Sequence, residues 1–106
     1  MKTIWKFPLP IEACVLEMPR GAIILALQTQ WIIAPRPYRL EKDERETFPC
    51  LWAIVDTEAP KEKRRFETFG TGHLFPDNPG KYIGTFQLLD GRFIGHVFET
   101  TGLKEG

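Results

Sequence analysis

The chain of 106 residues is long enough for one domain with a modest core and too short for two. Its 14 Lys and Arg balance 14 Asp and Glu, which argues against general binding to nucleic acid or anionic lipid, because such binding grows with the phosphates neutralised. Hydrophobic residues make up 42% of the chain and aromatic residues 12%, which excludes disorder by composition and favours a β-rich core.

Targeting and redox signals are weak. The first ten residues, MKTIWKFPLP, contain prolines where a signal peptide needs an unbroken apolar stretch, and no apolar run approaches the ~18 residues of a membrane helix. The two cysteines, Cys14 and Cys50, are too few for a disulfide framework or a zinc site. We therefore expect a cytoplasmic protein without membrane contacts, in which both thiols are buried and unreactive.

Short apolar runs bounded by Pro and Gly predict strands over residues 3–7, 13–18 and 22–30. The second run alternates, with Cys14, Leu16 and Met18 on one face. The third run is apolar on both faces in its first half, which predicts a central strand.

Residues 31–48 interrupt this pattern with Pro35, Pro37 and a mixed charge run, and they predict a long loop or an extended hairpin. Aromatic and Arg side chains are typical of interface anchors. The candidate partner contacts are Trp31, Ile32, Ile33, Arg36, Tyr38 and Arg39. The alternative is that this segment folds back over an open end of the core.

Residues 50–56 are apolar on both faces and predict a buried strand, residues 57–63 predict a charged turn, and residues 64–71 predict an alternating strand. Residues 82–89 and 92–100 flank Asp90-Gly91, which is typical of a two-residue type I′ hairpin. This turn sets a register in which the following positions face each other: Leu89 and Arg92, Leu88 and Phe93, Gln87 and Ile94, Phe86 and Gly95, Thr85 and His96, Gly84 and Val97, and Ile83 and Phe98. Tyr82 is then expected at the end of the apolar face that packs on the core.

These elements predict an all-β protein with a single small domain over residues 1–106. We expect about seven antiparallel strands in a sandwich or bent barrel, because strands with apolar residues on one or both faces must hide them against a second layer. Residues 31–48 form the long excursion, and residues 102–106 a frayed tail.

The string GTGH is the clearest candidate ligand loop. Adjacent glycines allow backbone amides to converge on an anion, and Thr71 and His73 add side-chain donors beside Gly70 and Gly72. His96, Thr85 and Gln87 form a second candidate group, which could hydrogen-bond a nucleobase or a partner. The alternatives are a glycine-rich strand exit for the first group and a half-exposed polar face for the second.

No catalytic constellation is evident, and we predict a protein that is not an enzyme. The sequence contains no serine, so a serine nucleophile is excluded. Two histidines and two scattered cysteines lack the close spacings of metal sites, and we expect neither a metal nor a cofactor.

Several strings carry a resemblance to known proteins: MKTIWKFPL, PCLWAIVDTEAP, RRFETFGTGH, YIGTFQLLDG and HVFE. Through them the chain resembles a family of small, mostly uncharacterised proteins of bacteriophages and prophages. The resemblance covers nearly all of the chain outside residues 31–48, where the relatives have a short turn, often with Asn-Gly. It implies a strand-rich fold, the GTGH loop and a place in the cytoplasm of an infected bacterium.

These observations predict a non-enzymatic accessory protein that binds and neutralises a host component, either an immune effector or its nucleotide signal. For a nucleotide, the GTGH loop would bind phosphates, Arg64 or Arg65 would supply charge, and Phe69 or Tyr82 would stack on the base. The site would then lie between subunits of a homo-oligomer. The alternatives are a virion structural or assembly protein that acts through homo-oligomeric interfaces, and a small hydrolase that uses His73 and His96.

Overall fold

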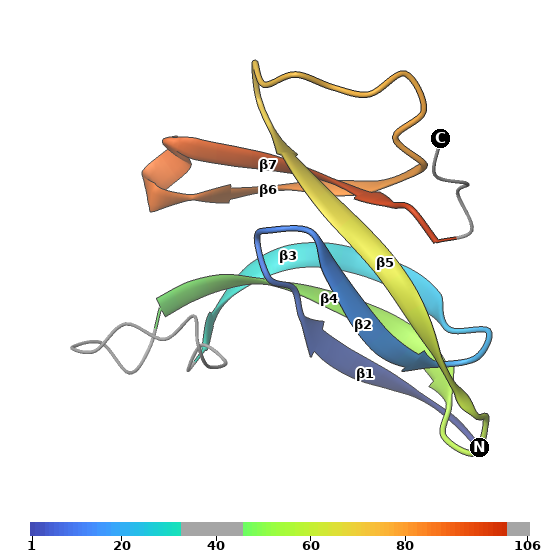
Figure 1. Cartoon of the computed structure of the whole chain (residues 1–106). Helices are drawn as coiled ribbons and strands as arrows, with labels where there is room; N and C mark the ends of the chain where they lie inside the picture. Colours follow the sequence, from blue (N-terminus) through green and yellow to red (C-terminus); the bar gives the residue numbers. More distant parts are fainter. Residues whose placement is uncertain (33–45, 102–106) are drawn as a thin grey trace.

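The computed structural model describes residues 1–32 and 46–101, which form seven strands in two antiparallel sheets (Figure 1). The first sheet has the order β1 (Lys2–Pro8), β4 (Glu46–Asp56), β3 (Ile23–Ile32). The second sheet has the order β2 (Cys14–Pro19), β5 (Lys61–Gly70), β7 (Phe93–Glu99), β6 (Lys81–Leu88). The prediction of an all-β fold with antiparallel strands is confirmed.

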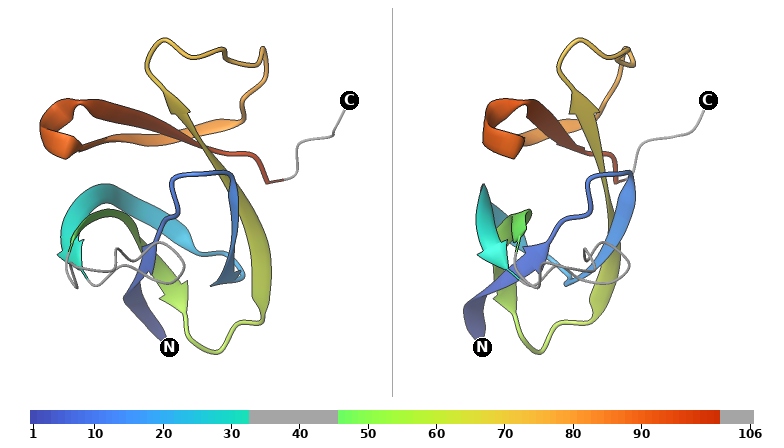
Figure 2. Two further views of the ribbon diagram at one scale, coloured as in Figure 1. Left: turned by 60° about the vertical axis from the view of Figure 1, so that its left-hand side comes forward. Right: turned by 90° about the vertical axis from the view of Figure 1, so that its left-hand side faces the viewer.

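The core lies between the two sheets and is built by the period-two alternation of strand side chains. Leu51, Ala53 and Val55 of β4 point inward from the central strand of the first sheet. They meet buried side chains of the second sheet and its flanks, namely Leu9, Met18, Phe66, Phe86 and Val97. The strand β5 pairs with β2 through its first half and with β7 through its second half, so it runs the full height of the sandwich (Figure 2).

The strand β3 is an edge strand, so the prediction that residues 22–30 form a central strand is wrong. Its neighbour on one side is β4, and on the other side it lies beside β6 without a hydrogen-bonded ladder in the described residues. Ile23 is 57% exposed and Leu25 50% exposed. The second apolar face of this run therefore does not pack in a sheet interior, and it lines an opening between β3 and β6.

The hairpin of β6 and β7 has the predicted register from Gly84 to Leu88, with Leu88 opposite Phe93 and Thr85 opposite His96. The predicted two-residue turn is wrong, and so is the pairing of Leu89 with Arg92. Instead, a 3₁₀ turn over Leu89–Gly91 connects the strands, and the Arg92 amide donates to the Leu89 carbonyl at 3.1 Å. The longer connection places Leu89 and Gly91 in the left-handed region, with φ of 54° and 85°.

A β-bulge between Tyr82 and Gly84 changes the start of the same hairpin. The residue opposite Phe98 is Tyr82 and not Ile83, as the uninterrupted register predicted. Because one extra residue reverses the alternation of side chains, Tyr82 lies on the outer face of the sheet and not at the end of the core face.

Two strand boundaries in the structure also differ from those predicted from the sequence. Residues 61–63, expected in a charged turn, begin β5 and pair with residues 17–19 of β2. The ends of the 31–48 segment extend the ladder of β3 and β4 as far as the pair Ile32 and Glu46. Residues 33–45 lie outside the described residues, as does the tail 102–106.

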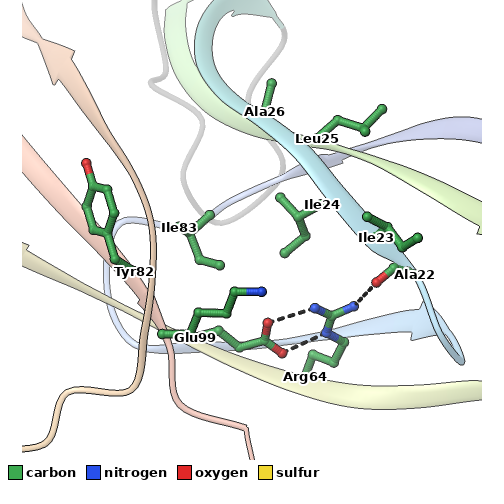
Figure 3. A pocket seen from close by; sticks show the side chains of 10 residues that line it. Ala22, Ile23, Ile24, Leu25, Ala26, Arg64, Tyr82, Ile83 and Glu99 are labelled. Carbon is green, nitrogen blue, oxygen red and sulfur yellow. Dashed lines mark hydrogen bonds and ion pairs between the residues drawn. The ribbon is translucent and has the colours of Figure 1, made fainter.

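A mostly buried ion pair lies within the second sheet, and its arginine also reaches the first sheet. Arg64 of β5 donates from Nε and Nη2 to the two carboxylate oxygens of Glu99 in β7, each at 2.7 Å, and its Nη1 donates to the carbonyl of Ala22 at 2.6 Å (Figure 3). The two side chains are only 14% and 12% exposed. Burial alone would raise the pKa of Glu99, but the hydrogen bonds from Arg64 and Thr101 and the nearby positive charges lower it.

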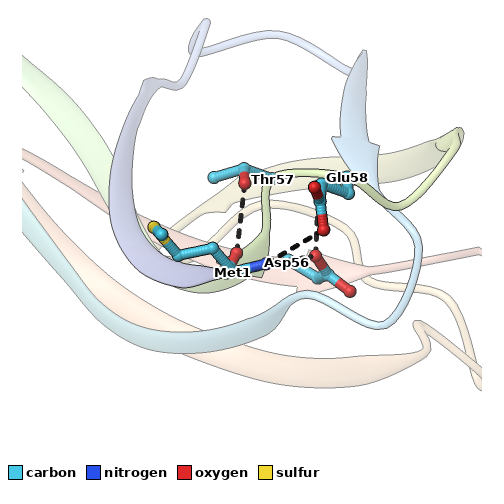
Figure 4. Close-up of polar contacts among 4 residues, drawn as sticks. All are labelled: Met1, Asp56, Thr57 and Glu58. Carbon is cyan, nitrogen blue, oxygen red and sulfur yellow. Dashed lines mark hydrogen bonds and ion pairs between the residues drawn. The ribbon is translucent and has the colours of Figure 1, made fainter.

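A second, exposed group of contacts holds the start of β1. The Met1 ammonium lies 3.3 Å from Asp56 and 3.4 Å from Glu58, and the Met1 carbonyl accepts from the amide and hydroxyl of Thr57 (Figure 4). The amide of Glu58 and then the ammonium lower the pKa of Asp56. These contacts fix the β1 end against the turn that leads from β4 to β5.

Replacing Gly95 with Ala should destabilise the fold by about 1–3 kcal/mol, because overpacking strains a closely packed core. A Cβ at Gly95 would lie 2.6 Å from Cζ of the buried Phe86 and 2.8 Å from Cγ2 of Thr68. Urea unfolding measures the loss. The matched control is Gly70→Ala at the register partner of Gly95, where the nearest atoms belong to the exposed His73 ring, which can rotate away. Equal losses in the two variants would contradict the packing argument.

Glu99→Gln should cost about 3 kcal/mol at neutral pH, because it leaves the mostly buried Arg64 without its counter-charge. The folded-state pKa of Glu99 is lowered, so its stabilising effect is present above the unfolded value and lost as pH falls through the folded pKa. Wild-type stability should therefore fall more steeply in acid than that of the variant. Glu62→Gln is the control, since its 3.9 Å pair with Arg20 is exposed and should contribute less than about 1 kcal/mol. Parallel acid profiles of wild type and Glu99→Gln would refute this role.

Candidate functional site

The outer face of β5, β7 and β6 gathers aromatic and hydrogen-bonding side chains in two adjacent rows. Phe69, His96 and Thr85 form one row across the three strands. Glu67, Phe98 and Tyr82 form the next. We call this surface the aromatic face, and it is defined by Phe69, Thr71, Phe75, Tyr82, Thr85, His96 and Phe98.

Four rings pack against one another on this face. Phe98 lies at the centre, with ring centroids 5.8 Å from Phe69, 5.2 Å from Phe75 and 5.4 Å from Tyr82, all in edge-to-face geometry. Phe75 belongs to the loop between β5 and β6, and its ring also lies 4.9 Å from that of Phe69. Edge-to-face pairs contribute about 0.5–1.5 kcal/mol beyond area burial, so Phe75 holds the loop against the sheet.

Beside the rings, three hydroxyl groups and an imidazole form a continuous chain. His96 Nε2 lies 2.8 Å from the Thr71 hydroxyl, and His96 Nδ1 lies 3.0 Å from the Thr85 hydroxyl. The Thr85 hydroxyl is in turn 2.6 Å from the hydroxyl of Tyr82. The bulge before Gly84 is what brings Tyr82 into this chain, because it turns that side chain to the outer face.

This chain of hydrogen bonds is better suited to binding a ligand or partner than to transferring a proton. Both nitrogens of His96 are occupied by hydroxyl groups, and none of the described carboxylates hydrogen-bonds to His96 or His73 to orient either ring as a base. The hydroxyl groups hold the imidazole in one orientation and leave the exposed Tyr82 at the end of the chain. The result is a fixed set of polar groups at the border of an apolar surface.

Two backbone amides of the GTGH loop already donate to backbone carbonyls. The amide of Thr71 donates to the Ile94 carbonyl at 3.3 Å, and that of His73 donates to the Gly70 carbonyl at 3.1 Å. Gly72 takes a positive φ of 83°, as the turn requires, and the His73 ring lies over Gly70. The amide of Thr71, one of those expected to meet an anion, therefore already has a backbone partner.

The structure separates Arg64 from the rest of the predicted site. Alternation along β5 places Arg64 on the inner side, where it pairs with Glu99, and Arg65 on the outer side at an exposed position four residues before Phe69. The expectation that Arg64 lies with the GTGH loop is therefore wrong. Gln87 is exposed on the outer face, with its side-chain oxygen beside Gly91 at the hairpin end.

The predicted partner contacts of the excursion cannot be placed on this face. Trp31 and Ile32 belong to the end of β3 in the first sheet, and only their backbone is described. The other four, Ile33, Arg36, Tyr38 and Arg39, lie outside the described residues.

Sequence reasoning missed Phe98, Phe75 and Leu74. The hairpin register already placed Phe98 on the face of His96, so that ring could have been found. Phe75 and Leu74 lie in an irregular loop, where no periodicity indicates which side chain turns back to the sheet.

The two cysteines and the possibility of a metal site can be judged over the described residues. Burial, with a smaller effect of Glu12, raises the pKa of Cys14 to about 11, and burial also raises that of Cys50, so both thiols stay protonated at neutral pH. Nowhere in residues 1–32 and 46–101 do three or more His, Cys, Asp or Glu side chains gather as a metal site would need. The same residues contain no helix with the length and apolarity to cross a membrane.

Comparison with known protein families finds a match over nearly the whole chain. The family described as "Domain of unknown function (DUF7352)" matches residues 1–105. The chain belongs to this family. No curated protein and no solved structure matches it.

Thr71→Val should lower stability by about 0.5–1 kcal/mol, because it removes the hydroxyl partner of His96 Nε2 while keeping the side-chain shape. It should also shift the imidazole nitrogen resonances of His96. Thr3→Val is the control, an exposed threonine on β1 whose hydroxyl has no partner among the described residues. If both variants behave alike in unfolding and in the imidazole spectrum, the chain of hydroxyls does not exist in solution.

Proposed function

We propose that this protein is a non-enzymatic bacteriophage accessory protein that binds a host protein through its aromatic face and thereby neutralises it. The viral context comes from the sequence resemblance alone. The geometry of the outer face supports the binding role.

The observation that carries the proposal is the exposure of large apolar side chains beside this face. Leu74 is 97% exposed in the loop that Phe75 holds to the sheet. Phe75 itself is 52% exposed and Tyr82 55% exposed. A protruding aliphatic side chain next to packed aromatic rings has the composition of an interface hot spot, and a polar border with fixed donors adds specificity.

A protein target fits this surface better than a nucleotide. Phosphate binding needs free amides or cations, but the amides of Thr71 and His73 donate to carbonyls and Arg64 is neutralised on the other side of β5. An apolar tip beside rings that already pack against one another offers contact area to a protein surface. Neutralisation then means that the bound protein covers a functional surface of its target.

Leu74→Asp should weaken binding of the target while leaving the fold intact, because the side chain is almost fully exposed. The tagged protein is used to capture proteins from bacterial lysate. A captured protein is then purified, and its affinity and activity are measured with wild type and variants. We expect at least a tenfold loss of affinity and a matching loss of inhibition with Leu74→Asp.

Leu89→Asp is the matched control, since Leu89 is 69% exposed in the 3₁₀ turn at the far end of the hairpin. Equal affinity of wild type and Leu74→Asp, or equal losses in both variants, would reject the aromatic face as the contact. Native mass spectrometry tests the nucleotide form of the hypothesis and the predicted homo-oligomer together. A retained nucleotide-sized mass would overturn the preference for a protein target.

A further inference from the structure

The sandwich is open along one side, where β1 and β2 form the edges of the two sheets. Along the opposite side β3 and β6 lie beside each other, and each of them carries a bulge. The strands β1 and β2 run in opposite directions and share no ladder within the described residues (Figure 1). Neither strand has a bulge in its own ladder. Regular edges of this kind are templates for pairing with a further strand.

The edge of β1 presents both side chains and backbone groups to solvent. Residues 2–6 are all exposed. The amide of Leu9 donates to the carbonyl of Pro49 at 2.9 Å, so the odd-numbered residues of this segment bond to β4. Backbone groups of an antiparallel strand alternate between its two sides. Three residues of β1 therefore direct their N–H and C=O groups to the open side, namely Lys2, Ile4 and Lys6.

The edge of β2 is arranged in the same way. The amide of Arg20 donates to the carbonyl of Pro60 at 2.8 Å, which continues the ladder of β2 and β5 by one pair. The even-numbered residues of β2 therefore bond to β5, and Val15 and Glu17 direct their N–H and C=O groups to the open side. Both side chains are exposed on the outer face of the second sheet.

The charges on these two edges are opposite. Lys2 and Lys6 are exposed on β1, and Glu17 is exposed on β2. Two β1 edges would repel each other, because an antiparallel pair centred on Ile4 places Lys2 opposite Lys6 of a second copy. An antiparallel pair of β1 with β2 of a second copy instead places Lys2 opposite Glu17, and Ile4 opposite Val15.

We propose that two copies of this chain pair through these edges as a two-fold dimer, with β1 of each copy beside β2 of the other. Because β1 and β2 run in opposite directions within one copy, a two-fold axis along the strands makes both contacts antiparallel and identical. The three strands of each first sheet then continue into the four strands of the other copy's second sheet. The aromatic face lies over β7, β6 and the second half of β5, away from β2, so this dimer is independent of the proposed binding role.

The charged row of each joined sheet is complementary across its whole width. Lys2 lies opposite Asp56 of β4, and Glu17 lies opposite Lys63 of β5. When Lys2 meets Glu17 of the second copy, the four side chains form a row in which negative and positive charges alternate. Opposite charges on directly facing residues favour the pairing of two strands.

The neighbouring rows match apolar side chains. On the outer face Ile4 meets Val15 of the second copy, and these side chains are 55% and 48% exposed in the single chain. On the inner face Trp5 meets Cys14 of the second copy. Trp5 lies opposite the buried Ala53 and is 37% exposed, and Cys14 packs against the core. Core-facing residues therefore stay with core-facing residues across the contact.

Other registers lose these matches. A shift of two residues in one direction places Lys2 opposite Pro19, which has no N–H, and Ile4 opposite Glu17. The same shift in the other direction places Lys2 opposite Val15 and leaves Glu17 beyond the end of the chain. A shift of one residue turns the core-facing side chains of one strand outward.

Sedimentation velocity and native mass spectrometry of the full chain test the proposal, and the wild type should be a dimer. Lys2→Glu and Glu17→Lys each place like charges opposite each other at both contacts, so each alone should raise the dimer dissociation constant at least tenfold. A mixture of the two variants restores opposite charges at both contacts and should form heterodimers within threefold of the wild-type affinity. Arg92→Glu, an exposed residue beside the hairpin turn, changes the charge equally and should leave the dimer unchanged.

Two further variants test the edge itself. Ile4→Pro removes the central N–H of the open edge without removing a bond to β4, and it should give a folded monomer. Facing residues of an antiparallel pair lie at a separation that a disulfide can bridge. Ile4→Cys mixed with Val15→Cys should therefore form a cross-linked heterodimer on oxidation, whereas Ile4→Cys mixed with Leu89→Cys should not.

Thermal unfolding checks that each variant is folded, and if Ile4→Pro does not fold, the charge variants decide. A monomeric wild type would overturn the proposal. Failure of the mixed charge variants to associate would overturn it too. A dimer without the cross-link between positions 4 and 15 would show that the copies meet through another surface.

Discussion

The guanidinium of Arg64 joins the two layers of the sandwich, because it pairs with Glu99 within the second sheet and also donates to the carbonyl of Ala22, directly before β3 of the first sheet. A mostly buried charge pair is stable only when its geometry and hydrogen bonds are nearly complete, so it constrains how β3, β5 and β7 lie relative to one another. With Arg64 directed inward, the alternation of β5 directs Arg65 and Phe69 outward. The composition of the aromatic face thus depends on a contact made on the opposite side of the strand.

Bulges on β6 and β3 also determine which side chains reach the surface. The bulge before Gly84 turns Tyr82 to the outer face, where its hydroxyl reaches Thr85 and extends the chain from His96. A second bulge, before Ala26, lies on the facing edge of β3, and β3 and β6 form no ladder within the described residues. A regular hairpin would have put Tyr82 toward the core, so the aromatic face depends on a local departure from the ideal strand.

The aromatic face differs in chemistry from the cavity between β3 and β6. The aromatic face offers rings, an exposed leucine and fixed hydroxyl groups, which favours broad contact with a protein. The cavity between β3 and β6 is small, and the Arg64–Glu99 pair lines it together with Ile24 and Ile83. Both arise from side chains of the same β5 and β6 strands, because successive residues of a strand point to opposite faces.

Local sequence patterns determined the all-β class, the alternation of β2 and the pairing of Thr85 with His96, because these depend on neighbours within one strand or one hairpin. They could not determine that Thr71 closes on His96, that Phe75 returns to Phe98, or that Arg64 meets Glu99 across 35 positions of sequence. The apolar character of β3 was also visible, but its two apolar faces suited a central strand and an edge beside a cavity equally well. Only the tertiary structure decided between them, since the position of β3 depends on where the second sheet lies and not on any residue within the strand.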